Sequence, residues 1–582
     1  MLKSHQVLSL FVLALLFSHQ CLAQNARVDV TIVGVDELLL DNVKKSLSIN
    51  TNKSNNSRIQ ALHAQAVNEI KQALQPFGYY HPKIKSRLEK KNDSWLAKYT
   101  IDKGRATLIN SLSINVKGSA SKEPFIQDFI AAVPLVKGNK IDHALYETTK
   151  KQLINLAFER GYLDVVYELS ELRINLEKFS ADINLVLSTG KQYFFGDVKI
   201  EQDILDKNYV KRYVKIQSGD PYRSQSLLNL QIDLLNTNYF RSLDIRNNKS
   251  DAFDNLIPIT IQAEPALRRR YSGRVGYGTD TGYRVGLGYT DNRVTTTGHQ
   301  FLSDIQISEV ESQISARYKI PIGNPAVEFT DFILKAKKET VNQTDSVQYV
   351  IGSSYNIERY NGLLRSFFTI EQEEFTFGNG PTSISNLFIP GVSYFKRQTK
   401  NTLFSRDGYS LFAQIKAGVN TTGDDTQFLQ GQLSIKNVTS ITEQSRLLFR
   451  FDYGKLLSDH FSRLPPSQRF YTGGARTVRG FTYQSIAPKN TNGITIGGNT
   501  LATSSVEFDY LIRGNLGFAA FYDVGDVNQD DEFDFKQSLG LGLRYRSPIG
   551  MIRIDFAKPI DTKTRRNNQD SLRLHLSMGP DL

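Results

Sequence analysis

Cysteine is nearly absent from this chain of 582 residues, in which Cys21 is the single example. One cysteine can form no internal disulfide and builds no cysteine-based metal site. Long apolar runs are equally scarce. The run from Val7 to Phe17 follows Lys3 and precedes the small-residue stretch that ends at Ala23, which is the pattern of a secretory signal peptide. We therefore predict a signal peptide at residues 1–23; the alternative, a lipid anchor on Cys21, lacks the Leu-like residue that it needs upstream.

After residue 23, no apolar run reaches the roughly 18 residues that a membrane-spanning helix requires. A membrane protein of this sequence must therefore be a β-barrel. Its 34 Phe, 27 Tyr and 40 Gly accompany a mean hydropathy of -0.34, because alternating barrel strands hide their apolar face from such averages. The net charge of +12 could suggest nucleic-acid binding, but the basic residues are scattered, and Arg268 to Arg270 is the main short run. We expect no nucleic-acid partner.

From residue 272 onward, the sequence breaks into segments of about ten residues in which apolar and polar side chains alternate. In residues 539–546, for example, Leu and Tyr alternate with Gly and Arg. A water-soluble sandwich alternates too, but the signal peptide favours the membrane. Because an arginine facing lipid at the bilayer midplane costs about 2 to 4 kcal/mol, the charged set must face a polar lumen.

The number of alternating segments fits a closed barrel. About eleven precede residue 460 and about five follow residue 500, and their even total is what bacterial barrels require. About 20 residues for each strand and its turn then account for residues 266–582. We predict an all-β transmembrane barrel of sixteen antiparallel strands over this range.

Residues 24–265 show helical periodicity interleaved with short strands and contain an internal repeat. Spacings of 83 and 77 residues separate the recurring punctuation, which is Gly78-Tyr79, Gly161-Tyr162 and Asn238-Tyr239. Each unit has a strand, two helices and two strands, an order that resembles the POTRA (polypeptide-transport-associated) domain. Edge strands of such units can accept an extended client chain. With three generic α+β domains as the alternative, we predict three POTRA-like domains at 24–103, 104–189 and 190–265.

The stretch from residue 462 to 499 is far longer than a hairpin connection between the eleventh and twelfth predicted strands needs. It contains Val478-Arg479-Gly480-Phe481, which resembles the Val-Arg-Gly-Phe/Tyr signature of the sixth extracellular loop in the BamA/TamA outer-membrane assembly superfamily. The resemblance implies that the loop folds back into the lumen, where its arginine meets acidic residues on strands twelve and thirteen. The alternative is an exposed arginine on a flexible loop.

Two carboxylates are expected where Arg479 arrives. Alternation places Glu507 inward, and Asp523 lies in residues 521–525, which resemble the family's Phe-x-Asp-x-Gly strand. A guanidinium is a planar fork of donors that a carboxylate accepts at two points, and lysine has no such fork. We expect Gly480 to permit close backbone approach and Phe481 to pack.

Residues 546–559 and the ending at 578–582 resemble the TamA (translocation and assembly module) branch of this superfamily. That resemblance implies an assembly factor that helps insert and fold other outer-membrane β-barrel proteins such as autotransporters, with its barrel in the outer membrane and its arm in the periplasm. The implied partners are a TamB-like inner-membrane-anchored protein on the arm, client outer-membrane proteins and outer-membrane lipid. The alternatives are a two-partner-type secretion transporter that exports a dedicated substrate and a component of intermembrane lipid transport.

An insertase needs a barrel whose closure is marginal, because full closure removes every free strand edge. The predicted first strand carries Gly276 and Gly278, and the last strand carries Leu574 and ends beside Gly579-Pro580. Because proline donates no ladder hydrogen bond, we expect short pairing between these two seam strands.

We find no pattern of an enzyme, cofactor or metal site in the sequence. Residues Gly418 to Gly423 have the spacing of a phosphate loop, but Asp424 follows where lysine is required. The eight His residues are dispersed, with no pair at metal-ligand spacing. We therefore expect no catalytic residues, no cofactor and no metal.

Overall fold

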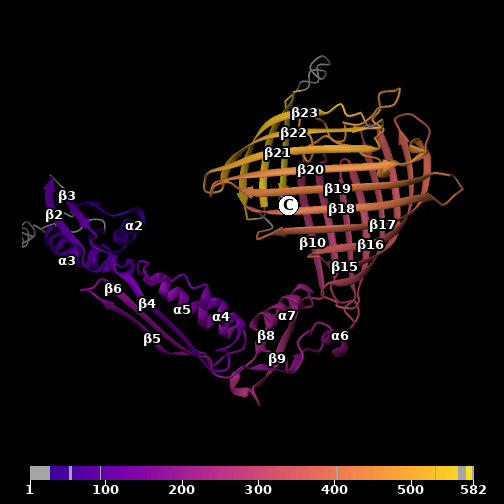
Figure 1. The fold of residues 1–582 in the computed structure, drawn as a ribbon. Helices are drawn as coiled ribbons and strands as arrows, with labels where there is room; N and C mark the ends of the chain where they lie inside the picture. The colour runs from indigo at the N-terminus through magenta and orange to yellow at the C-terminus, as the bar shows by residue number, and fades with distance from the viewer. Residues whose placement is uncertain are drawn as a thin grey trace, which may run out of the picture. The chain divides into compact units, whose positions relative to one another are not determined.

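The computed structural model describes residues 27–50, 55–91, 94–401, 404–423, 425–530, 532–548, 550–560 and 572–579. The predicted signal peptide and Pro580 lie outside these residues. In the described part of the chain, no helix is both long and apolar enough to cross a membrane. Three small three-stranded sheets, each with helices, precede one large antiparallel sheet (Figure 1).

The first domain is a three-stranded sheet with two helices packed on it. Its elements are β1 (Arg27–Val33), α2 (Glu37–Ser46), α3 (Asn56–Leu74), β2 (Lys83–Lys91) and β3 (Ser94–Asp102). The helices begin after Asp36 and Asn55, whose side chains accept hydrogen bonds from the first free backbone N–H groups. β3 lies in the middle, parallel to β1 and antiparallel to β2, and its Tyr99 is fully buried against the helices.

The second and third domains repeat this order of elements. The second contains β4 (Leu108–Lys117), α4 (Pro124–Ala131), α5 (His143–Phe158), β5 (Val166–Asn175) and β6 (Ser180–Ser188). The third contains β7 (Phe194–Glu201), α6 (Lys207–Lys211), α7 (Ser224–Asn236), β8 (Phe240–Arg246) and β9 (Leu256–Pro265). The central strands of the two sheets are β6 and β9.

The recurring Gly-Tyr or Asn-Tyr pairs have the same backbone role in all three domains. Gly78, Gly161 and Asn238 adopt positive φ angles of 83°, 90° and 61° shortly after a helix ends. Glycine reaches this left-handed region without strain, and asparagine is among the few other residues that tolerate it. The repeat in the sequence is therefore a repeated helix-ending turn. The tyrosine that follows is buried in the second and third domains, at Tyr162 and Tyr239.

Sixteen strands, β10 to β25, form one antiparallel sheet in which each strand pairs with its neighbours in sequence. The prediction of a sixteen-stranded antiparallel barrel is confirmed. The strands are β10 (Arg269–Gly278), β11 (Gly282–Asp291), β12 (Gln300–Ser308), β13 (Glu311–Pro321), β14 (Glu328–Val341), β15 (Thr344–Arg359), β16 (Gly362–Phe377), β17 (Ser383–Thr399), β18 (Gly408–Asn420), β19 (Gln427–Ser440), β20 (Ser445–Leu457), β21 (Thr500–Arg513), β22 (Leu516–Asn528), β23 (Lys536–Ser547), β24 (Gly550–Pro559) and β25 (Arg573–Gly579).

Side chains alternate between two faces along these strands. In β23, Leu539, Leu541 and Leu543 are 50%, 66% and 50% exposed, whereas Arg544 is 1% exposed. The apolar set is the exposed one, so it faces lipid, and the charged set faces the lumen. This is the arrangement that the alternation in the sequence predicts.

A cluster of buried tyrosines fastens a barrel turn to part of the third domain that belongs to the same compact unit. Tyr239 donates from Oη to the main-chain oxygen of Gly298, between β11 and β12, at 2.5 Å. The Oη of Tyr209 lies 3.1 Å from that of Tyr239 and 3.0 Å from that of Tyr213. Burial raises the pKa of all three phenols far above its ordinary value, so they remain neutral hydrogen-bond donors.

Candidate functional site

The connection between β20 and β21, residues 458–499, is a folded unit that lies against the inner wall of the barrel. It begins with two 3-10 helices, η4 (Phe461–Arg463) and η5 (Pro466–Gln468). Arg469 is 7% exposed and donates to three main-chain oxygens of the same connection. Phe470 packs with apolar side chains of the wall. The connection is therefore long because it forms an ordered structure of its own. Its backbone N–H and C=O groups find hydrogen-bond partners within that structure.

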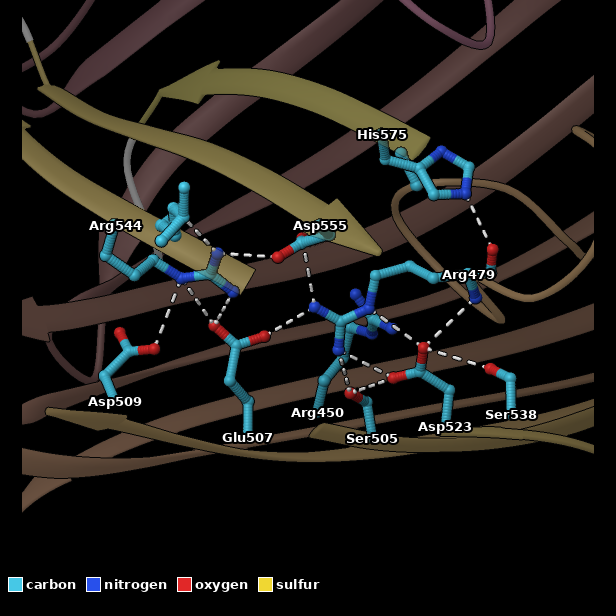
Figure 2. A network of polar contacts seen from close by, with 12 residues as sticks. Arg450, Arg479, Ser505, Glu507, Asp509, Asp523, Ser538, Arg544, Asp555 and His575 are labelled. Carbon is cyan, nitrogen blue, oxygen red and sulfur yellow. Dashed lines mark hydrogen bonds and ion pairs between the residues drawn. The ribbon is translucent and has the colours of Figure 1, made fainter. Parts of the chain in front are cut away.

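Near the middle of this connection, Arg479 is 4% exposed and pairs with Asp523 of β22, which is fully buried (Figure 2). Its Nε and Nη2 donate to the two carboxylate oxygens at 2.9 and 2.8 Å, and its main-chain N–H adds a third hydrogen bond at 3.1 Å. Ser505 donates to the same carboxylate at 2.6 Å. This two-point pairing holds both the position and the plane of the guanidinium.

The remaining guanidinium nitrogen of Arg479 joins two further strands. Nη1 donates to Glu507 of β21 at 2.6 Å and to Asp555 of β24 at 3.3 Å. The guanidinium carbon also lies 3.2 Å from the ring centroid of Phe521, an arrangement in which the ring face attracts the cation. One loop side chain thus contacts three wall strands, β21, β22 and β24.

The pairing continues along the inner wall through Arg544 (Figure 2) and then through Arg446. Arg544 donates to Glu507 and to Asp555, each at 2.6 Å. Asp509 then links Arg544 to Arg446, 3.3 Å from the first and 2.6 Å from the second. Each of these charges is buried, so each depends on its partners for the stabilisation that water would otherwise give. Removing one member of such a network typically costs about 3 to 5 kcal/mol.

Gly480 lies where there is no room for a side chain. A Cβ on this residue would lie 2.6 Å from the Cβ of Ser538 and 2.9 Å from the main-chain nitrogen of Pro559. The preceding Val478 is fully buried, and Phe481 is half-buried with its N–H donating to the Val478 oxygen at 3.1 Å. The absence of a side chain at Gly480 lets the loop backbone lie directly on β23 and β24.

The two seam strands, β10 and β25, are joined differently from the others. Over the described residues, backbone ladders connect every consecutive pair from β10 to β25, but none connects β25 back to β10. Gly276 and Gly278 lie in β10, and Leu574 and Gly579 lie in β25. Side chains meet across the seam instead: the Nδ1 of His575 lies 3.2 Å from the Oγ1 of Thr279. 

The loop beside Arg479 attaches to both sides of this seam. On the β25 side, Arg573 donates to the main-chain oxygen of Gly480 at 3.0 Å, and the Nε2 of His575 donates to that of Arg479 at 2.6 Å. On the β10 side, Asp280 accepts a hydrogen bond from the N–H of Ala475 at 2.7 Å and lies 3.5 Å from His575. We call Asp280, Arg573 and His575 the seam latch. It joins the edges of the sheet through the loop.

Comparison with known proteins places this architecture in a family. The model of the Omp85 superfamily domain matches residues 201–581. The chain belongs to the Omp85 superfamily. A second model, described as POTRA domain TamA domain 1, matches residues 29–103 of this Omp85 protein. The barrel therefore lies in the outer membrane, and the POTRA domains that precede it lie in the periplasm.

Curated relatives of this Omp85 protein are named outer membrane protein assembly factor BamA. The relative from Nitratidesulfovibrio vulgaris (strain Hildenborough) is 25% identical over 459 residues, which are 72% of this chain and 55% of the relative. The relative from Neorickettsia risticii (strain Illinois) is 24% identical over 408 residues, 64% of this chain and 53% of the relative. The chain thus spans about half the length of the curated relatives it matches.

A solved structure shares the fold of this Omp85 protein. It is the crystal structure of BamA from Haemophilus ducreyi lacking POTRA domains 1-3, with a TM-score of 0.63 and 15% sequence identity. The similarity covers 81% of this chain and 99% of that one.

Within the described residues of our structure, no group of three or more His, Cys, Asp or Glu side chains is placed to hold a metal ion.

Sequence reasoning placed Arg479, Asp523 and Glu507 in one site, and the structure brings these three side chains together. The sequence reasoning did not predict the wider network, which also includes Arg544, Asp555, Asp509 and Arg446. The alternation already turned Arg544 and Asp555 inward, so both residues could have been named as lumen-facing, but their pairing depends on the register of β23 and β24. No pattern in the sequence pointed to the seam latch. His575 contacts the loop and Asp280 only because barrel closure brings β25 next to β10.

Proposed function

We propose that this Omp85 protein inserts and folds outer-membrane β-barrel proteins, and that client strands enter through the seam between β10 and β25. The observation that carries the proposal is the missing ladder between these strands over the described residues, with side chains in its place. Strand edges without a ladder can pair with an incoming strand by β-augmentation. The relatives named as outer membrane protein assembly factors support the same function.

The arginine network has a defined role in this proposal. Arg479 holds the loop on β21, β22 and β24, and the loop in turn holds the latch residues of both seam edges. A client strand that enters the seam must separate Asp280 from His575 but leaves the network on the far side of the loop intact. The loop would then close the seam again once the client has left.

The test is to link the seam covalently. Cys21 lies in the predicted signal peptide, so the mature chain would offer no competing thiol. Thr279→Cys with His575→Cys, joined by a short bis-maleimide, links the seam, whereas Val275→Cys with Val285→Cys links two residues already paired in the β10–β11 ladder. In liposomes, we expect the seam link to slow insertion of a small barrel client at least tenfold relative to the control link. Equal rates for the two linked proteins would overturn the proposal.

We further propose that the periplasmic arm binds a TamB-like inner-membrane-anchored protein. The match of the first domain to the TamA model supports this partner. In that domain, β1 and β2 are the edge strands, but β2 carries five basic residues, Lys83, Lys85, Arg87, Lys90 and Lys91. Lysine-rich edges discourage strand addition, which leaves β1 as the better docking edge.

Photo-crosslinking in whole cells tests this partner. A photoreactive amino acid at the exposed Asp29 of β1 is compared with the same amino acid at the exposed Arg87 of β2. We expect one large inner-membrane-anchored protein to be captured from position 29 and little from position 87. Capture of a single secreted exoprotein would instead favour export of a dedicated substrate and overturn the assembly proposal.

A further inference from the structure

The turn between β17 and β18 carries a second structure that contacts the arginine network, formed by residues 404–407, which we call the strap. The third domain leads directly into β10, so β10 begins at the periplasmic end of the barrel. Because the strands reverse direction at every step, β17 ends and β18 begins at that same end. The loop of residues 458–499 joins its strands at the opposite end. The strap and the loop therefore approach the network from opposite sides of the membrane.

Phe404 of the strap lies beside arginines from two strands that pair with neither β17 nor β18. The guanidinium carbon of Arg446 in β20 is 4.2 Å from the centre of the Phe404 ring, and that of Arg546 in β23 is 4.4 Å from it. Four strands lie between β18 and β23 in the sheet. The face of an aromatic ring attracts cations, and the attraction is stronger where water is excluded. With Phe404 only 7% exposed, one ring attracts two lumen arginines from well-separated strands.

Hydrogen bonds to the neighbouring turn, between β19 and β20, hold the strap in place. The Nη2 of Arg406 donates to the main-chain oxygen of Thr442 at 2.7 Å. The carboxylate of Asp407 accepts from the N–H of Ser440 at 2.8 Å and from its hydroxyl at 2.9 Å. These bonds are separate from the ring contacts, so the backbone beside Phe404 has an attachment of its own.

The strap covers the periplasmic end of the arginine network. Arg446, Asp509 and Arg544 are 4%, 4% and 1% exposed, and Arg446 donates from Nη1 to the main-chain oxygen of Ser405 at 2.5 Å. The space left between the strap and these side chains is about 10 Å³, which holds at most about one water molecule. Opposite charges attract each other far more strongly in a dry interior than in water. The strap thus maintains the conditions under which these ion pairs are strong.

Ion pairs lead from this covered end to the loop. Arg446 pairs with Asp509 at 2.6 Å, and Asp509 lies 3.3 Å from Arg544. Arg544 donates to one oxygen of Glu507 at 2.6 Å, and the other oxygen of Glu507 accepts from Arg479 of the loop, also at 2.6 Å. Water that entered at the strap would weaken these pairs one after another, because each shares a charged group with the next.

We propose that Phe404 is a positioning residue for the loop, which acts through the arginine network from the periplasmic end of the barrel. Its ring attracts two of the arginines and keeps water from the ion pairs that hold Arg479. Displacement of the strap from the periplasmic side would therefore loosen the loop on the other side of the membrane. The ring face is needed as well as the apolar bulk, since an aliphatic side chain attracts no cation.

The test compares three substitutions in the full mature chain in detergent. Phe404→Leu keeps an apolar side chain without the ring face, and Phe404→Tyr keeps the face. Tyr360→Leu makes the same aromatic-to-leucine change in the β15–β16 turn, at the same end of the barrel, where Tyr360 is 83% exposed. Two rates are measured: protease cleavage within residues 458–499, and hydrogen exchange of the Arg479 amide, which donates to Asp523.

We expect Phe404→Leu to raise both rates about threefold, as the loss of contacts between a ring and its cations predicts. Phe404→Tyr should stay closer to the wild type than Phe404→Leu, and Tyr360→Leu should match the wild type. Wild-type rates in Phe404→Leu overturn the proposal. So does a Phe404→Tyr protein that is as fast as Phe404→Leu, or an equal acceleration by Tyr360→Leu.

Heat-shift electrophoresis checks that each variant is folded. If Phe404→Leu is not, Arg406→Gln is measured by the same criteria, because it removes the hydrogen bond from the strap to Thr442 and leaves every side chain of the arginine network in place. Client insertion is not the readout, so failure here leaves the proposed function standing.

Discussion

His575 in the last strand donates a hydrogen bond of 2.6 Å to the main-chain oxygen of Arg479, which lies 96 positions earlier in the chain. The same histidine lies 3.5 Å from Asp280, just after the first strand. The side chain of Arg479 is paired with wall carboxylates, so His575 connects the seam to the most strongly held point of the loop. Movement of the loop is therefore coupled to opening of the seam between β10 and β25.

Replacing Arg479 with alanine is expected to release the loop. The change removes the cation that pairs with Asp523, Glu507 and Asp555, which stay buried. Leaving buried carboxylates without this partner typically lowers the free energy of unfolding by about 3 to 5 kcal/mol. We expect the barrel to remain folded by heat-shift electrophoresis, while residues 458–499 become sensitive to protease. Arg479→Lys keeps the charge but loses the fork, and we expect intermediate sensitivity. Unchanged digestion of both variants would contradict this role of the loop.

Gly480→Ala tests the close approach of the loop to the wall. The new Cβ would lie 2.6 Å from the Ser538 Cβ and 2.9 Å from the Pro559 nitrogen, an overlap of the kind that costs about 1 to 3 kcal/mol. We expect a lower unfolding temperature and faster digestion of the loop. Gly431→Ala is the matched control, since a Cβ there meets nothing within 4 Å. Equal behaviour of the two alanine variants would show that the loop has room to move away.

The seam latch is open to a double-mutant cycle. His575→Ala and Asp280→Ala each remove one side of the contact across the seam, so we expect each to broaden the distance distribution between spin labels at Val275 and Leu574. The double variant should broaden it little further, because the two side chains act through one contact. His299→Ala, which removes a histidine bonded to Tyr318, is the control. Fully additive effects would show that the two residues act separately.

Tyr239→Phe is expected to loosen the turn between β11 and β12. The change removes the donor to the Gly298 oxygen, and a buried acceptor left without a donor costs about 1 to 3 kcal/mol. Hydrogen exchange of residues 292–299 should accelerate. Tyr222→Phe removes another hydroxyl, which accepts from Asn247 away from this turn, and should leave its exchange unchanged. If both variants leave the exchange of the turn at the wild-type rate, the tyrosine cluster does not hold it.

The fold was predictable from the sequence because alternation depends only on neighbours along the chain. Alternation determined that Glu507 and Arg544 face the lumen, and the helix-ending turns at Gly78 and Gly161 marked the repeat. It could not determine which inward charges meet, because that depends on how far each strand is shifted against the next. Ser505 lies directly opposite Asp523 only in the observed register of β21 and β22. A shift of two residues keeps every face and changes every pair.

A network of buried ion pairs braces one part of the inner wall. They connect β20 through Arg446, β21 through Glu507 and Asp509, β23 through Arg544, and β24 through Asp555. These strands are cross-braced and resist shear as one panel, whereas β10 carries three glycines, Gly273, Gly276 and Gly278, which have no side chains to form such pairs. Bending of the wall will therefore be asymmetric. When the seam widens, β10 and its neighbours bend, while the ion-paired strands from β20 to β24 stay stiff.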